Sequence, residues 1–182
     1  MVLSIRNLFG KKAKTTKAWQ EIEYFDEAWK ERIKIMSSFI PSGAQSVMDL
    51  GCGKMWLKTY LPVTCNYYGI DYTYRGEGSE VFDFNKYEFP LLSTDVIFVS
   101  GCLEYVKDYE WFIKEVASKC KRCIISYCIV DVFSNLEERR ALTWVNDLTE
   151  KEFINLFTKN NMKLIDKTKT ATENYIYIYE NE

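Results

Sequence analysis

A chain of 182 residues is long enough to bury the core of one domain, and 47% hydrophobic with 16% aromatic residues is a composition typical of globular proteins. The 24 basic and 26 acidic residues leave a net charge of -2, which argues against a nucleic-acid partner because phosphate binding usually needs a basic excess. No run of about 18 apolar residues occurs, so we expect no transmembrane segment.

The six cysteines occur without a signal peptide, which indicates reduced thiols and a cytoplasmic protein. Cys120 and Cys123 have the C-x-x-C spacing that can bind zinc or carry redox chemistry. The sequence contains no histidine and no second C-x-x-C pair that would complete a metal site. We therefore expect no metal, and we interpret both thiols as members of a buried strand.

The N-terminal residues are basic. Every charged side chain within residues 1–17 is a lysine or an arginine, and the first acidic residue is Glu21. We expect residues 1–15 to be a flexible segment and residues 16–182 to form a single domain. The alternative interpretation is a weak contact of residues 1–17 with a membrane surface.

The next part of the chain alternates between predicted helices and strands. Residues 16–40 carry apolar side chains at three- and four-residue steps, which predicts a helix that ends at Pro41. A strand from about residue 46 leads into a turn at Gly51 and Gly53, and a helix is expected after this turn. Further strands are predicted at residues 67–71, 81–82, 95–100 and 122–128, with a helix at 111–119 before the last of them.

The remainder of the chain changes in character. Residues 131–140 are polar and predict a loop or short helix over one edge of the sheet, where acceptor recognition is often placed. Thr149 and Glu152 form a capping box that opens the next helix. Strands at residues 163–167 and 175–179 are separated by a polar hairpin. This order predicts an α/β fold.

Residues 47–71 have the order of a nucleotide-binding βαβ unit. Gly51 and Gly53 allow a sharp turn at the end of the first strand, where the backbone can approach a ligand closely. Asp71 follows Gly51 by 20 residues, the interval at which a carboxylate ending the second strand meets ribose hydroxyls. The pattern therefore indicates a ligand that contains adenosine.

The same glycines argue against the dinucleotides. A dinucleotide fingerprint needs a glycine three residues after Gly53, and this chain has Trp56 there. No G-x-x-x-x-G-K-[ST] sequence occurs, which excludes the P-loop as a motif. NAD, FAD and P-loop nucleotides are therefore not the expected ligands.

The turn resembles motif I of the class I S-adenosylmethionine-dependent methyltransferases. That motif has an acidic residue followed by spaced glycines, here Asp49, Gly51 and Gly53, with Met55 in place of the third glycine. Asp83 followed by an apolar residue is similar to the family's adenine-binding position.

The resemblance extends to the fourth predicted strand. This strand leads through Gly101 into CLEYVKD, which looks like the family's segment beside the cofactor. The segments DFNK and LEY also resemble small methyltransferases of bacterial glycan biosynthesis. The motifs lie within residues 47–108, roughly a third of the chain.

The resemblance implies a small, single-domain methyltransferase with S-adenosylmethionine as cofactor. Its fold is a Rossmann-like three-layer sandwich, whose mostly parallel sheet has an antiparallel C-terminal hairpin strand. Tyr72, rather than Tyr74, is expected against adenine. The residues implied in cofactor binding are Asp49, Gly51, Cys52, Gly53, Asp71, Tyr72, Asp83, Phe84 and Gly101.

A hydroxyl acceptor must lose a proton, and the chain has no histidine to remove it. The catalytic candidates are Glu104 and Tyr105 after the fourth strand, followed by Tyr127 and Asp131 after the fifth. Glu104 is the first choice, as the base or as the group that orients the acceptor. Tyr105 is a hydrogen-bonding group, because a phenol with a pKa near 10 is a poor base.

The expected activity is O-methylation of a small-molecule or sugar-like acceptor, such as a glycan. Two alternatives stay open. An N-methyltransferase acting on an amine or a protein would need no base, because a neutral amine attacks directly. A non-catalytic partner would keep the fold and activate another subunit.

Overall fold

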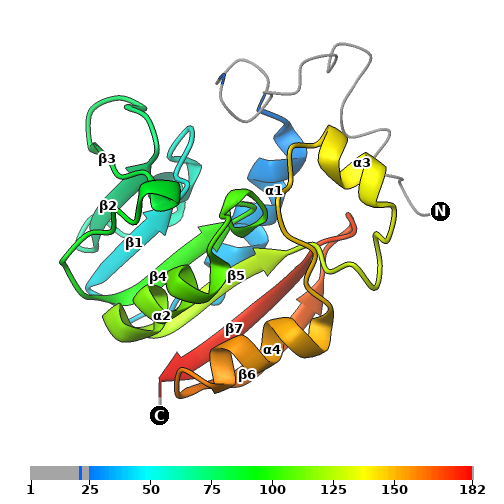
Figure 1. Cartoon of the computed structure of the whole chain (residues 1–182). Helices are drawn as coiled ribbons and strands as arrows, with labels where there is room; N and C mark the ends of the chain where they lie inside the picture. The colour runs from blue at the N-terminus through cyan, green and yellow to red at the C-terminus, as the bar shows by residue number, and fades with distance from the viewer. Residues whose placement is uncertain (1–20, 22–24, 182) are drawn as a thin grey trace.

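Residue 21 and residues 25–181 are described by a computed structural model, whose centre is a seven-stranded sheet in the order β3-β2-β1-β4-β5-β7-β6 (Figure 1). Neighbours among β1 to β5 are parallel, whereas β7 is antiparallel to both β5 and β6. The mainly parallel sheet and its antiparallel terminal hairpin confirm the expected α/β class. The strands are β1 (Ser46–Leu50), β2 (Asn66–Asp71), β3 (Ser79–Val81), β4 (Thr94–Ser100), β5 (Cys120–Tyr127), β6 (Met162–Lys169) and β7 (Tyr175–Asn181).

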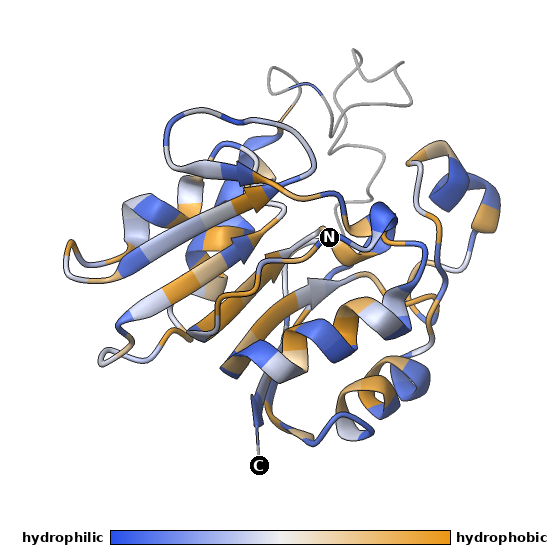
Figure 2. Ribbon diagram, turned by 60° about the vertical axis from the view of Figure 1, so that its left-hand side comes forward, coloured by the Kyte–Doolittle hydropathy of each residue, from blue (hydrophilic) through white to orange (hydrophobic). Residues whose placement is uncertain are grey.

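Alternate residues of the central strands face two different hydrophobic cores. In β4, Val96 and Phe98 belong to one core, and Ile97 and Val99 belong to the other. Neighbouring side chains on a strand point to opposite faces, so an unbroken apolar run is buried on both sides. Figure 2 shows apolar residues concentrated in these central strands.

Helices cover both faces of the sheet and make three layers (Figure 1). Helix α1 (Glu27–Ser37) and the 3₁₀ helix Trp56–Tyr60 pack on one face, where Met36 joins the first core. Helices α2 (Tyr109–Lys119) and α4 (Glu150–Thr158) pack on the other face.

The first helix is shorter than predicted. Helix α1 begins at Glu27 because the Asp26 carboxylate accepts a hydrogen bond from Ala28 N at 2.8 Å and caps the helix. Residues 38–40 form a turn rather than a last helical turn. Residues 16–20 and 22–24 lie outside the described residues, as does the basic segment 1–15.

The helix expected after the glycine turn is also different. Only the five-residue 3₁₀ helix Trp56–Tyr60 forms there. Met55, directly before it, has a left-handed backbone with φ of 52°, and Pro62 holds Leu61 extended directly after it. The chain therefore turns through this region without a full α-helix.

Two further expectations, the capping box and the burial of Cys120 and Cys123 in a strand, are confirmed. The capping box forms, because Glu152 N donates to Thr149 Oγ1 and Thr149 N donates to Glu152 Oε2. Cys120 and Cys123 are buried in β5, and the Cys120 thiol donates to the carbonyl of Val116.

The short helix expected in residues 131–140 is α3 (Leu136–Ala141), which follows the carboxyl end of β5 (Figure 1). In the described part of the chain, no helix is long and apolar enough to cross a bilayer.

The strand order places a ligand site. From β1 the chain goes to β2 and β3 on one side, and β4 then pairs with the opposite side of β1. In an open parallel sheet, ligands bind outside the carboxyl ends of the strands where the order reverses in this way. The reversal lies between β1 and β4.

Candidate functional site

A cavity of about 370 Å³ lies at this reversal point. Its walls come from the turn after β1, the end of β2, the end of β4 and side chains of α1. The volume is in the range of small-molecule sites. Among the described residues, no group of three or more His, Cys, Asp or Glu side chains is placed to hold a metal ion.

The cavity brings together the two first catalytic candidates and all the residues implied in cofactor binding except Asp49. Those that line it are Gly51, Cys52, Gly53, Asp71, Tyr72, Asp83, Phe84, Gly101, Glu104 and Tyr105.

Asp49 lies beneath the turn rather than in the cavity wall. Its carboxylate accepts a hydrogen bond of 2.8 Å from the Tyr67 hydroxyl, and the residue is 3% exposed. Burial raises the pKa of Asp49 to about 7. Asp49 is therefore placed as a support of the turn.

The glycine turn has the left-handed backbone that its sequence predicted. Gly51 has φ of 77° and Gly53 has φ of 48°. A Cβ at Gly51 would lie 2.8 Å from Cys102 Cβ, and a Cβ at Gly53 would lie 2.2 Å from the ring of Phe25. These two positions require glycine both for the backbone and for the close approach.

Asp71 connects this turn to the end of β2. Its Oδ2 accepts a hydrogen bond of 3.0 Å from Gly53 N, and Arg75 Nε lies 3.1 Å from the same oxygen. No donor in the described part of the chain reaches Oδ1 of Asp71. Tyr72 also lines the cavity, whereas Tyr74 is 66% exposed and does not.

The turn at Asp83 forms another part of the wall. Asp83 Oδ1 accepts a hydrogen bond from Asn85 N, and the Asn85 side chain bridges to Tyr105 O and Lys107 N. Phe84 is 6% exposed and packs against Phe112, so it serves the core as well as the wall.

Glu104 is buried at the inner side of the cavity. Its Oε1 accepts a hydrogen bond of 3.2 Å from Cys128 N, and its Oε2 has no hydrogen-bond partner among the described residues. Burial raises the pKa of Glu104, while the positive charge of Arg32 opposes this shift. A buried carboxylate oxygen without a partner is costly, which makes Oε2 the clearest point for a ligand to donate a hydrogen bond.

Two side chains missed from the sequence complete this end of the cavity. Arg32 of α1 donates from Nε to Ser100 Oγ at 3.1 Å and lies against Gly101. Trp144 lines the cavity and donates from its indole nitrogen to the Tyr105 hydroxyl at 3.3 Å. No local pattern signals either residue, because helix α1 and the segment 128–148 reach the site only through tertiary packing.

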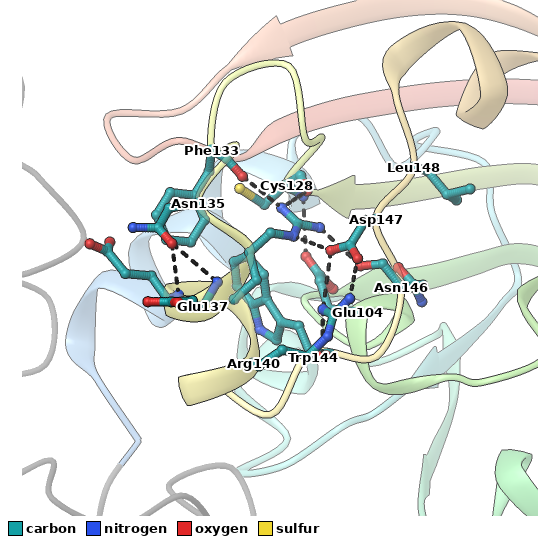
Figure 3. Close-up of polar contacts among 12 residues, drawn as sticks. Glu104, Cys128, Phe133, Asn135, Glu137, Arg140, Trp144, Asn146, Asp147 and Leu148 are labelled. Atoms are coloured by element: carbon teal, nitrogen blue, oxygen red, sulfur yellow. Dashed lines mark hydrogen bonds and ion pairs between the residues drawn. The ribbon is translucent and has the colours of Figure 1, made fainter.

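The segment 128–148 is held by Arg139, which has no exposed side-chain surface. Its guanidinium donates to the carbonyls of Cys128, Phe133 and Asn146 and pairs with Asp147 at 2.6 Å. Figure 3 shows Glu104, Trp144, Asn146 and Asp147 gathered within this network. The guanidinium also lies 4.9 Å from the centre of the Trp144 ring, so Arg139 fixes the cavity wall.

The two further catalytic candidates lie elsewhere. The Tyr127 hydroxyl is buried in the core, where it donates to Asn146 Oδ1 and accepts from Leu148 N. Asp131 accepts from Glu150 N at the start of α4 and does not line the cavity. The structure therefore places neither residue as a base for a ligand in this cavity.

The comparisons with known proteins agree with this geometry. A sequence family described as a methyltransferase domain matches residues 14–165. The chain belongs to this methyltransferase family. No curated protein sequence matches the chain.

Solved structures of methyltransferases share the fold of this domain. Magnesium protoporphyrin IX methyltransferase from Synechocystis PCC 6803, with bound SAH, has 13% identity and a TM-score of 0.68 over 91% of this chain and 93% of its own. A methyltransferase from Clostridium acetobutylicum ATCC 824, described as S-adenosylmethionine-dependent, has 12% identity and a TM-score of 0.62 over 85% of this chain and 91% of its own.

A third structure is human N-acetylserotonin methyltransferase in complex with SAM, with 14% identity and a TM-score of 0.67. It is matched over 98% of this chain but only 60% of its own. These neighbours establish the Rossmann-like methyltransferase fold for this domain.

The buried Asp49 gives the domain a pH-dependent stability. Its pKa in the folded protein, about 7, exceeds the ordinary value of 3.8, so the folded state holds a proton that the unfolded chain has released. The free energy of unfolding therefore falls as pH rises from about 4 to about 7, by up to about 4 kcal/mol. Asp49→Asn removes this fall, and urea unfolding at pH 4 to 8 measures it.

Asp166→Asn is the matched control for Asp49→Asn, because Asp166 is exposed on β6. We expect it to keep the wild-type pH profile. Parallel profiles for wild type and Asp49→Asn would show that Asp49 is ionised at neutral pH in the folded state.

Arg139 and Arg140 share Asp147 but differ in burial, with side chains 0% and 48% exposed. We expect Arg139→Met to lower the free energy of unfolding by about 3–5 kcal/mol, since it leaves Asp147 and buried carbonyls without their partner. Arg140→Met should cost less than about 1 kcal/mol, as exposed ion pairs do. Chemical denaturation compares the two, and equal losses would contradict the assigned role of Arg139.

Proposed function

We propose that the cavity binds S-adenosylmethionine and that the protein transfers its methyl group to a hydroxyl of a small-molecule or sugar-like acceptor. The observation that carries the proposal is the meeting of the glycine turn, the Asp71 carboxylate and the partnerless Glu104 oxygen in one cavity at the strand-order reversal. Family membership and the fold neighbours support the same reaction class.

The residues of the cavity fit this cofactor. Asp71 Oδ1 is available to accept from a ribose hydroxyl, and Tyr72 provides an aromatic surface beside it. The turn at Asp83 suits the adenine end. Gly51 and Gly101 line the cavity, and their backbone would hold the amino-acid end.

Methyl transfer to a hydroxyl requires that the acceptor oxygen be aligned with the methyl group and that the hydroxyl lose its proton. S-adenosylmethionine, when bound, supplies an electrophilic methyl group. Trp144 and Tyr105 form a rigid wall against which an acceptor can be oriented, and orientation is a large share of catalysis in such a displacement. Glu104 Oε2 accepts the proton of the acceptor hydroxyl or orients it.

Glu104 suits the role of general base because of its surroundings. Burial raises the pKa of Glu104, and a carboxylate with a raised pKa removes protons more effectively near neutral pH. Cys128 N holds the other oxygen in place, so the carboxylate is fixed in orientation.

The acceptor is the finer part of the proposal. The likeness of the segments DFNK and LEY to small methyltransferases of glycan biosynthesis makes a sugar hydroxyl the first acceptor to test. Incubation with radiolabelled S-adenosylmethionine and a panel of sugars, phenols and amines tests the reaction. Cofactor binding without transfer to any hydroxyl acceptor would overturn the proposed O-methylation.

Asp71 is expected to determine cofactor affinity. Asp71→Asn keeps the shape and loses a charge-assisted hydrogen bond, so affinity for S-adenosylhomocysteine should fall about tenfold. Calorimetry on folded protein measures this, with Asp166→Asn as a control that changes an exposed carboxylate of β6. NAD should not bind. Unchanged affinity in Asp71→Asn would show that Asp71 does not bind the ribose.

Glu104→Gln separates catalysis from binding. We expect unchanged affinity for S-adenosylhomocysteine and a turnover lowered about a hundredfold with a hydroxyl acceptor, in line with general-base contributions. Transfer to a neutral amine, which needs no base for its attack, should change little. Equal losses for hydroxyl and amine acceptors would show that Glu104 positions the acceptor and removes no proton.

A further inference from the structure

Arg75 is buried beside the carboxylate that the proposed function assigns to ribose. The side chains of Arg75 and Asp71 are 5% and 6% exposed, and Arg75 Nε lies 3.1 Å from Asp71 Oδ2. Both residues line the cavity. An arginine so close to this carboxylate either competes with the ligand or prepares the carboxylate for it.

The oxygen that Arg75 contacts decides between these two roles. Asp71 Oδ2 already accepts the Gly53 N–H, so the contact of Arg75 Nε, which is an ion pair rather than a hydrogen bond, is with an oxygen that is engaged with the protein. Among the described residues, Oδ1 receives no donor. Arg75 therefore leaves one carboxylate oxygen available, whereas a competitor would occupy both oxygens in the bidentate manner that arginine favours.

Arg75 is itself held in place. Its guanidinium carbon lies 5.5 Å from the centre of the Phe25 ring and 5.4 Å from that of Tyr72. Its backbone N–H donates to Ser79 Oγ at 3.0 Å, which fixes the loop between β2 and β3. A cation close to two aromatic rings and on an anchored backbone is a preorganised partner for a carboxylate.

From these contacts we infer that Arg75 is a positioning residue, which fixes the Asp71 carboxylate so that Oδ1 reads a ribose hydroxyl of the bound nucleoside. This inference rests on the proposed binding of an adenosine cofactor in the cavity. Arg75 acts through Asp71, and its loss should weaken the recognition of the ribose more than the recognition of the base.

The test measures recognition of the ribose directly. Calorimetry gives the affinity for S-adenosylhomocysteine, and displacement of that ligand gives the affinities for adenosine and 2′-deoxyadenosine. We expect the wild-type protein to prefer adenosine about tenfold, the value of one hydrogen bond to a charged group. In Arg75→Met the preference should fall below about threefold, and affinity for S-adenosylhomocysteine should fall about tenfold.

Lys54→Met is the matched control. Lys54 lines the same cavity and lies 6.0 Å from the centre of the Phe25 ring, but it forms no ion pair with Asp71. We expect this variant to keep the wild-type preference for adenosine. Arg75→Lys keeps the positive charge and should restore part of the preference, and it also serves if Arg75→Met does not fold by circular dichroism.

The outcomes separate this inference from the proposed function. If wild-type protein does not bind S-adenosylhomocysteine, the proposed function and the role of Arg75 both fail. If it binds and Arg75→Met keeps the tenfold preference, only the role of Arg75 is overturned. Tighter binding by Arg75→Met would identify Arg75 as a competitor and would also overturn its positioning role. An equal loss for both nucleosides would reduce Arg75 to a structural residue.

Discussion

The site depends on the docking of the turn after β1 onto the end of β2. Gly51 N and Cys52 N both donate to Ile70 O, at 2.8 and 3.0 Å, and Gly53 N donates to Asp71. These bonds satisfy backbone donors that a buried turn would otherwise leave unpaired. They also fix the position of the glycine turn relative to the Asp71 carboxylate. The distance between these two parts of the cavity wall is therefore constant.

The cavity and the segment that closes it contain several buried ionisable side chains. Arg139 and Glu104 are almost completely buried, and Asp71 is close to that. Removing charges from water is costly unless hydrogen bonds compensate, and buried ion pairs are weak evidence of stability. Each of these groups contacts the cavity or holds a segment that lines it. Burial of these groups costs free energy of folding, and it holds the side chains of the site in place.

The sequence predicted the part of the site that depends on local backbone. Gly51, Gly53 and Asp71 were identifiable because a tight turn and a strand-ending carboxylate have fixed spacing along the chain. Asp49 was implied in cofactor binding but does not line the cavity, and a pattern of residue types does not tell whether a carboxylate beside a turn faces a ligand or the protein beneath it. The 3₁₀ helix was also unexpected, since Met55 adopts a backbone more typical of glycine.

The residues that escaped prediction belong to segments distant in sequence. Arg32 comes from α1, and Arg139 and Trp144 come from the segment after β5. Their positions follow from how these segments pack onto the sheet, which no periodicity encodes. The fold class, by contrast, was predicted, because strands that alternate with helices favour a mainly parallel sheet.

The position of β7 has a consequence for how the chain is made. The last strand in sequence lies between β5 and β6, so β5 has no second neighbour until residues 175–181 are available. Until then a buried, largely apolar strand forms the edge of the sheet, and such edges pair readily with other chains. Pairing with β7 thus removes β5 from the edge of the sheet and leaves β6 as the edge strand.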